Sequence, residues 1–188
     1  MQNAEGPVMG GGGSLIDMAT HCFSLLEFLT GDRITGIFAM TTNQVHGYRS
    51  EDSATSVIQF ASGCHASVDA FFCVRDESSL NRLEVYGDAG SLLAEGTLGQ
   101  EEGGTLVGVA SAAGEGYDAA QAREGGMGYR PIHFEEVNPY AAEMEYFAAC
   151  VRGGRQPEIN GWDEAIHIAE VTAAAYDSWR KGCFVRLP

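Results

Sequence analysis

A block of β-strand patterns between helical segments limits the fold of this chain more than any other feature. Residues 53–60 alternate apolar and polar side chains, and residues 64–72 do so again after the Gly-containing turn at 61–63. Two alternating segments joined by such a turn are typical of an antiparallel hairpin. We therefore expect a β-hairpin over residues 53–72.

Further strand patterns lie on both sides of this hairpin. The segment 34–45 is mostly apolar and β-branched, and a second hairpin is expected around Asp88-Ala89-Gly90. The strands of that hairpin are expected at residues 82–87 and 91–94. Three shorter strands are expected at residues 105–110, 132–137 and 184–187. The segment 111–128 is rich in Gly, Ala and acidic residues, and a loop of that length is usually functional or disordered.

Helical patterns flank the strands. An apolar stripe at helical spacing predicts a helix over residues 14–29, which Gly31 closes. A second helix is expected to start at Asn138-Pro139, because Asn is a good cap and Pro suits the first helical position. The pair Gly153-Gly154 is expected to end it.

A third helix is expected near the end of the chain. Asn160 would cap it, Asp163 would complete a partial capping box, and Gly182 would stop it. The side chains expected on its buried face are Trp162, Ala165, Ile166, Ala169, Ala173 and Tyr176.

The order of helix, strands and helices predicts an α+β fold. We expect an open, mostly antiparallel sheet with helices on one face, forming a single domain over residues 10–188 after an irregular lead-in at residues 1–9. Apolar residues occur on both strand parities, among them Phe38, Met40, Phe60, Phe71, Phe72 and Tyr86. Because the helices suffice for one face only, we expect a homo-oligomer formed through the free face of the sheet.

Charge and cysteine content exclude several classes of function. The chain has 26 acidic and 11 basic residues among 188, a net charge of −15, which disfavours binding to nucleic acids or to anionic membranes. It contains no apolar run long enough to cross a bilayer. Its five cysteines form no C-x-x-C pair, so we expect reduced thiols and a cytoplasmic location.

The strongest candidate site lies where four glycines, residues 10–13, lead into the first helix. Asp17 and His21 are four residues apart there, a spacing that places two side chains on one helix face, and such a pair suits general acid–base chemistry. The alternative is an acid favoured by the helix dipole beside an ordinary histidine. Gly11, Gly12 and Gly13 would either expose amides to an anionic cofactor group or form a hinge.

No metal site is expected, because the other histidines lack ligand spacing. They are His46, His65, His133 and His167.

Four stretches, in order, resemble one oxidoreductase family. They are Gly11-Gly12-Gly13-Ser14-Leu15-Ile16-Asp17-Met18-Ala19-Thr20-His21 with Leu25-Leu26-Glu27-Phe28-Leu29, residues 51–63, residues 82–92, and residues 140–182 with Ala174-Ala175-Tyr176-Asp177-Ser178. From about Gly10 onward the chain resembles the C-terminal domain of the glucose–fructose oxidoreductase / inositol dehydrogenase / MocA family. The resemblance implies a fold like the C-terminal domain of dihydrodipicolinate reductase.

The resemblance also implies a function. Family enzymes transfer a hydride between NAD or NADP and a carbinol carbon, commonly of a sugar or polyol. The residue matching His21 serves as proton donor or acceptor at the substrate hydroxyl, and the one matching Asp17 holds the substrate or the histidine. In the family this domain binds substrate, and its free sheet face packs in oligomers.

The chain also departs from the family pattern. It has neither the G-x-G-x-x-G turn nor the Glu-Lys-Pro segment of the N-terminal Rossmann domain, and its one lysine is Lys181. We therefore expect the chain to bind no cofactor and to be inactive alone, as a fragment or a stand-alone remnant that would need a separate Rossmann domain. The alternative is a non-enzymatic module for self-association or partner binding.

Overall fold

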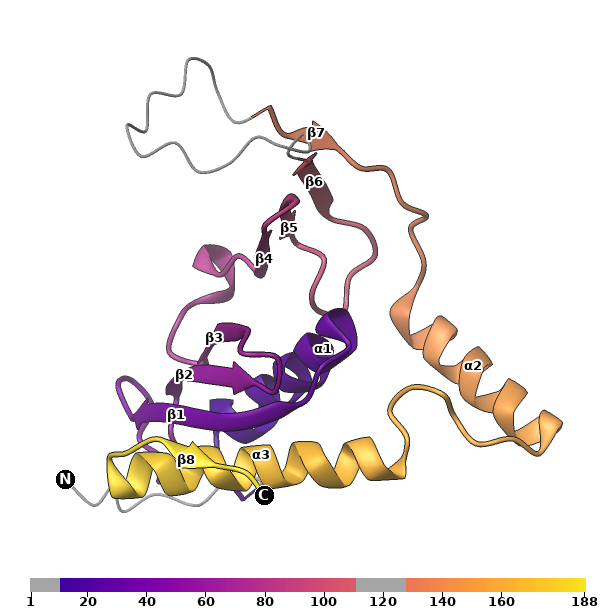
Figure 1. Ribbon diagram of the computed structural model, residues 1–188. Helices are drawn as coiled ribbons and strands as arrows, with labels where there is room; N and C mark the ends of the chain where they lie inside the picture. The colour runs from indigo at the N-terminus through magenta and orange to yellow at the C-terminus, as the bar shows by residue number, and fades with distance from the viewer. Residues whose placement is uncertain (1–10, 111–127) are drawn as a thin grey trace. The chain divides into compact units, whose positions relative to one another are not determined.

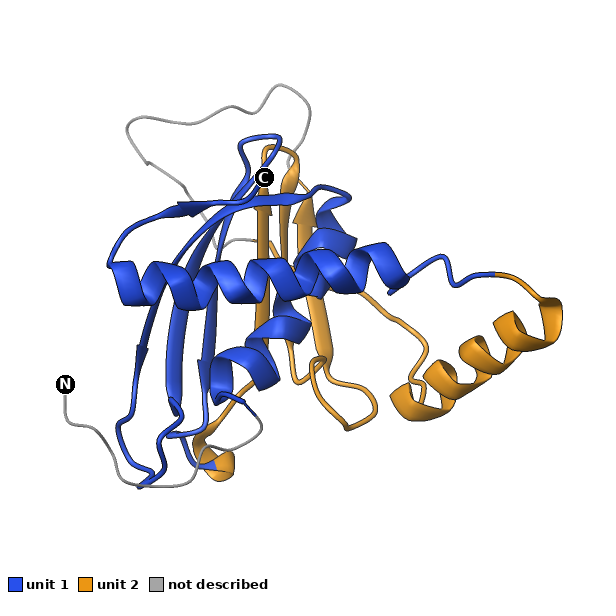
Figure 2. Cartoon of the chain, turned by 90° about the horizontal axis from the view of Figure 1, so that it is seen from below, with its two compact units in different colours: residues 1–75, 156–188 blue, residues 76–155 orange. Residues whose placement is uncertain are grey.

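The computed structural model describes residues 11–110 and 128–188, so most of the expected loop at 111–128 lies outside the described residues. The chain divides into two compact units, residues 1–75 with 156–188 and residues 76–155 (Figure 2). Within the described ranges each unit contains a four-stranded antiparallel sheet. The predicted α+β class is confirmed, and the antiparallel strands are divided between two sheets.

The first unit contains the sheet β3-β2-β1-β8. Its strands are β1 (Ile34–Thr42), β2 (Ser53–Phe60), β3 (His65–Phe71) and β8 (Val185–Arg186). The predicted hairpin is confirmed, since β2 and β3 pair antiparallel with Val57 opposite Ser67. The alternation of β2 follows its pleat, because alternate side chains lie buried beneath the helices. These buried residues are Ala54, Ser56, Ile58 and Phe60.

Three helical segments pack on one face of this sheet (Figure 1). They are the π-helical turn η1 (Leu15–Ala19), its continuation α1 (Thr20–Thr30), and α3 (Trp162–Lys181). Gly31 ends α1 in the left-handed region at φ 62°, as predicted. The buried core between helices and sheet is dominated by Leu15, Phe23, Ile34, Ile37, Ile58, Phe60 and Val171.

Helix α3 differs from the prediction in its cap and its buried face. Gly161, not Asn160, occupies the N-cap position, and the Glu164 carboxylate accepts from the Gly161 N–H at 2.6 Å. The buried positions are Ile168, Val171, Thr172, Ala175 and Ser178. Trp162 is 79% exposed and Ile166 43% exposed. Of the predicted face, Tyr176 packs partly buried against the core. The rest of the prediction was wrong because alanines occur all round this helix, so the apolar pattern does not single out one side.

The described residues of the second unit include the sheet β4-β5-β6-β7 and a long helix. The elements are β4 (Arg82–Gly87), β5 (Gly90–Glu95), β6 (Thr105–Ala110), β7 (Arg130–Pro131), a 3-10 turn at Asp76–Ser78, and α2 (Pro139–Gly153). The second predicted hairpin is confirmed by the pairing of β4 with β5. The strand predicted at 132–137 was wrong, because β7 ends at Pro131 after pairing with β6.

Both ends of α2 agree with the prediction. The Asn138 side chain accepts from the N–H of Ala141 at 2.9 Å, and Pro139 takes the first helical position. Gly154 closes the helix at φ 59°. Across the described ranges, no helix combines the length and apolarity needed to span a membrane.

Candidate functional site

Asp17 and His21 lie on the two halves of the first helical segment. Asp17 is in the π-helical turn η1 and His21 is in the first turn of α1. Both side chains are exposed, whereas Leu15 and Ala19 of the same turn are buried in the core. A single π-helical turn at the start of an α-helix frequently marks a functional site, because the extra residue redirects the side chains around it.

The side chains of Asp17 and His21 have no polar partner in the part of the chain that the structure describes. Among the residues that the structure describes, neither side chain makes a hydrogen bond or ion pair, with the other or with any third group. The carboxylate and the imidazole therefore both face solvent with their hydrogen-bonding capacity free. That arrangement suits two groups that act on a bound ligand.

Glu51 holds the turn that carries Asp17. One oxygen of its carboxylate, Oε1, accepts from the N–H of Gly13 at 3.0 Å, from the N–H of Leu15 at 3.1 Å, and from the hydroxyl of Tyr176 at 2.8 Å. The Glu51 carbonyl also accepts from the Ser14 N–H at 3.2 Å. Burial, and then the hydrogen bond to Glu51, raise the pKa of the Tyr176 hydroxyl well above its ordinary value.

The glycines before the helix are required by this close packing. A Cβ on Gly13 would lie 1.7 Å from the Glu51 carbonyl oxygen, and one on Gly12 would lie 2.2 Å from the Tyr176 hydroxyl. Gly11 has open space around it and a positive φ of 88°. The sequence suggested an anion-binding turn at Gly11, Gly12 and Gly13. In the structure the anion at the Gly13 amide is the protein's own Glu51, so that amide is not available to a phosphate.

The next residue, Asp52, organises the loop after β1. It is fully buried, and its carboxylate accepts from the backbone N–H groups of Gln44 at 2.7 Å, Val45 at 2.7 Å and His46 at 2.9 Å. Burial alone would raise the pKa of Asp52, but these three hydrogen bonds outweigh it and lower the pKa. Glu51 and Asp52 thus anchor two different backbone segments from adjacent positions.

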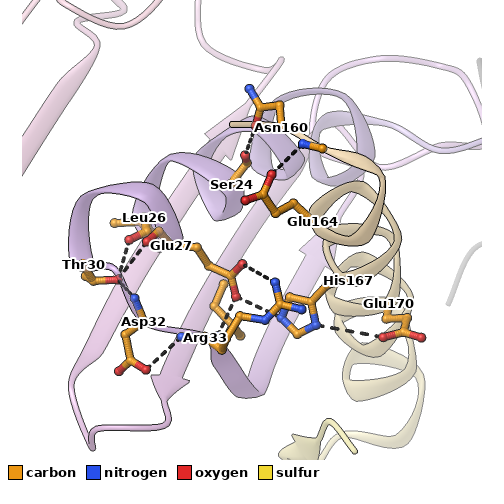
Figure 3. A network of polar contacts seen from close by, with 12 residues as sticks. Ser24, Leu26, Glu27, Thr30, Asp32, Arg33, Asn160, Glu164, His167 and Glu170 are labelled. Atoms are coloured by element: carbon orange, nitrogen blue, oxygen red, sulfur yellow. Dashed lines mark hydrogen bonds and ion pairs between the residues drawn. The ribbon is translucent and has the colours of Figure 1, made fainter. Parts of the chain in front are cut away.

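A second polar network joins the far end of α1 to α3 (Figure 3). Glu27 Oε1 accepts from the Ile34 N–H at 2.7 Å and lies 2.9 Å from His167 Nε2. The Glu27 carboxylate also lies 3.7 Å from Arg33 Nη1. The carboxylate is mostly covered by these groups, so the network serves to hold the two helices together.

The described residues contain no metal centre. They include no group of three or more His, Cys, Asp or Glu side chains arranged to hold an ion. His46, one of the histidines without ligand spacing, contacts the backbone: its Nε2 atom lies 3.0 Å from the Phe72 carbonyl oxygen.

Sequence reasoning did not single out Glu51 or Tyr176 as part of this site. They lie 38 and 163 residues beyond Gly13 in the chain. The only sequence signal for them is the glycine run itself, since adjacent glycines at the start of a helix indicate that another part of the chain approaches closely.

Comparisons with known proteins give a consistent result. Residues 3–93 match the model of the GFO/IDH/MocA C-terminal domain. The chain is 30% identical over 180 residues to the scyllo-inositol 2-dehydrogenase (NAD(+)) of Bacillus subtilis (strain 168), covering 94% of this chain and 48% of that protein. It is 26% identical over 175 residues to the D-apiose dehydrogenase of Paraburkholderia graminis, covering 91% of this chain and 44% of that protein.

The fold is also similar to that of solved structures. One is an aldose-aldose oxidoreductase from Caulobacter crescentus complexed with glycerol, with a TM-score of 0.76 and 22% identity, covering 94% of this chain and 48% of that one. The chain spans about half the length of the curated relatives it matches.

Proposed function

Because this chain belongs to the Gfo/Idh/MocA family and corresponds to the C-terminal part of such an oxidoreductase, we propose that it is the substrate-binding domain of an NAD(P)-dependent dehydrogenase. The proposed reaction is oxidation of a CH–OH group, or its reverse, on a sugar or polyol. The names of the relatives support this substrate class, since they specify inositol, apiose and aldose as substrates.

The observation that carries the proposal is the state of Asp17 and His21. Both are polar, exposed and without a hydrogen bond or ion pair among the described residues. Asp17 lies on the turn whose first N–H groups are bound by Glu51, and His21 follows that turn. A rigid backbone under two unengaged groups is what substrate binding and proton transfer need.

We assign His21 as the acid–base residue and Asp17 as its companion. During oxidation the neutral imidazole of His21 would take the proton of the reacting hydroxyl, and in the reverse direction the imidazolium would return it. The Asp17 carboxylate would accept a hydrogen bond from a neighbouring substrate hydroxyl or stabilise the protonated His21. NAD+ or NADP+, when bound, would supply the acceptor for the hydride.

A separate Rossmann domain is proposed to hold the dinucleotide. The glycine run of this chain does not fit a dinucleotide phosphate, because the N–H groups of Gly13, Ser14 and Leu15 already donate to Glu51. We expect calorimetric titration of the chain with NAD+ or NADP+ to show no binding at micromolar concentrations. A micromolar Kd would contradict the proposal that a separate Rossmann domain binds the dinucleotide.

Joining the two halves tests the proposal. The Rossmann half of the Bacillus subtilis relative would be fused to this chain, and NAD+ reduction would be followed at 340 nm with a panel of inositols and aldoses. We expect turnover by the fusion and none by either half alone. A correctly folded fusion that binds NAD+ but oxidises no member of the panel would argue against a substrate-binding domain.

The alternative function is a module for self-association. The sheet face opposite the helices exposes apolar side chains, with Met40 61%, Val57 48% and Phe71 37% exposed. An apolar face of this kind is suited to an interface between copies of the chain. A homo-oligomer is compatible with the enzymatic role, so oligomerisation alone does not decide between the two functions. The alternative would be favoured if the chain oligomerises and substitution of His21 leaves turnover by the fusion unchanged.

We also propose a cytoplasmic location. All five cysteines, each within the described residues, are free thiols. Reduced cysteines are typical of proteins kept in a reducing compartment.

A further inference from the structure

We infer that Glu51 is a positioning residue for the proposed active site, holding the π-helical turn η1 in the form that aims Asp17 and His21 at a common ligand. The inference rests on the proposed role of Asp17 and His21. Among the described residues, Glu51 makes no hydrogen bond or ion pair with either of them.

The start of this segment has no cap of its own. Ser14 occupies the N-cap position, but its side chain makes no capping hydrogen bond. The first N–H groups of a helix need acceptors, and a buried N–H without one is costly. Glu51 supplies them, because its side chain and its carbonyl together accept from Gly13, Ser14 and Leu15.

The same carboxylate joins three segments that are distant in sequence. Glu51 lies in the connection between β1 and β2, the amides belong to the glycine run, and the Tyr176 hydroxyl comes from α3. Three donors converging on one oxygen determine the carboxylate's orientation, and a charged acceptor makes each of these bonds stronger than a neutral one. The two glycines whose Cβ atoms would collide with Glu51 and Tyr176 let the backbone come this close.

This anchor matters to the site because of the π-helical geometry. A π-helical turn contains one residue more than the α-helical path would use. If the turn relaxed to an α-helix, residues before it would rotate by about 100° relative to residues after it, since an α-helix has 3.6 residues per turn. Asp17 lies within the turn and His21 follows it, so their relative direction depends on the turn being kept.

Spectroscopy of the chain tests the anchor independently of catalysis. Glu51→Gln keeps one carbonyl acceptor and the side-chain shape, whereas Glu51→Ala removes the acceptor. The matched control is Glu27→Gln, which alters another carboxylate that accepts a backbone N–H, at the opposite end of α1. Readouts are amide hydrogen exchange at Gly13 and Leu15 and the imidazole Hε1 resonance of His21.

The expected result is graded. Exchange at Gly13 and Leu15 should speed up about tenfold or more in Glu51→Ala and less in Glu51→Gln, because hydrogen bonds to a charged acceptor are lost or weakened. The His21 resonance should move or broaden in the same order and stay unchanged in Glu27→Gln. If the two Glu51 variants fold and leave the His21 resonance where it is, the inference is wrong. If Glu51→Ala does not fold, Glu51→Gln decides.

Turnover separates this inference from the proposed function. In the fusion with a Rossmann half, Glu51→Gln should lower kcat several-fold with the KM for NAD+ unchanged, and Glu27→Gln should keep both. The Glu51 variants could lose exchange protection and move the His21 resonance while the wild-type fusion shows no turnover. That result would contradict the proposed function and support the role of Glu51 in holding the turn. Wild-type kcat in Glu51→Gln would overturn the positioning role.

Discussion

At the scale of single residues, two consecutive carboxylates do different work in this protein. Glu51 accepts the N–H groups that begin the candidate-site helix, and Asp52 accepts three N–H groups of the loop after β1. In both cases a side chain replaces the hydrogen bonds that regular structure would otherwise provide. Gly13 and Glu51 therefore belong to one local structure, although 38 residues separate them in the chain.

Replacing Asp52 should lower stability in a pH-dependent way. We expect Asp52→Asn to reduce the free energy of unfolding by about 2–3 kcal/mol at pH 7, because buried N–H groups would meet an amide donor in place of a carboxylate oxygen. Folding lowers the pKa of Asp52, so its contribution is complete above the unfolded value near 3.9 and is lost as the pH falls through the folded pKa.

Urea unfolding at pH 7, 5 and 3 measures this effect. The difference between wild type and Asp52→Asn should narrow from pH 5 to pH 3, because protonated Asp52 loses the same acceptor. A difference that does not change with pH would contradict the role of the ionised carboxylate.

Substitution of Gly11 and of Gly13 by alanine should have very different effects on stability. Gly13→Ala places Cβ 1.7 Å from a backbone oxygen, so the β1–β2 connection must move, and we expect a loss of about 3 kcal/mol or more. Gly11→Ala meets no atom within 4 Å and should cost only about 1 kcal/mol for its positive φ. Thermal unfolding of both variants makes the comparison, and equal melting temperatures would refute it.

At the scale of secondary-structure elements, turn and cap residues made the boundaries predictable. The hairpin at 53–72 was correct because alternation and a Gly-containing turn agree, and α2 was correct because Asn138 and Pro139 mark its start. The buried face of α3 was wrong because alanine carries little information about burial. The π-helical turn was not predicted, since Asp17 and His21 keep the same sequence spacing in either helix form.

Alanine substitution of a large apolar side chain should affect stability differently on α2 and on α3. On α2, Phe147 is 58% exposed, so Phe147→Ala should change the free energy of unfolding of this chain by no more than about 0.5 kcal/mol. On α3, Ile168 is 6% exposed in the core, and Ile168→Ala should cost about 2–4 kcal/mol. Chemical denaturation checks both values. A large loss for Phe147→Ala would show that the Phe147 side chain is covered in solution.

At the scale of the whole molecule, the sequence predicted the class of fold and the candidate residues, while contacts between distant segments came only from the structure. Family resemblance pointed to Asp17 and His21, but no spacing rule connects Gly13 to Glu51 or Glu51 to Tyr176. Such long-range contacts depend on how strands and helices pack, which local patterns do not encode.

The exposed sheet face predicts self-association. Light scattering at tens of micromolar should show a dimer or larger species, because exposed apolar side chains such as Met40 and Val57 are suited to a partner copy. Val57→Asp should shift the chain toward monomer with its fold intact. The control Ala173→Asp adds the same charge at an exposed position of α3, away from this sheet face, and should leave the oligomeric state unchanged. A wild-type chain that is monomeric at this concentration would mean that the face is solvated.

We propose that His21 of this chain transfers the proton of the substrate hydroxyl. The measurement that tests it most directly is kcat/KM of His21→Ala in the fusion with a Rossmann half, compared with His133→Ala, an exposed histidine of the other unit. We predict a loss of about 10²- to 10⁴-fold for His21→Ala, as for other general acid–base residues, and no loss for His133→Ala. Undiminished kcat/KM in His21→Ala would contradict the account.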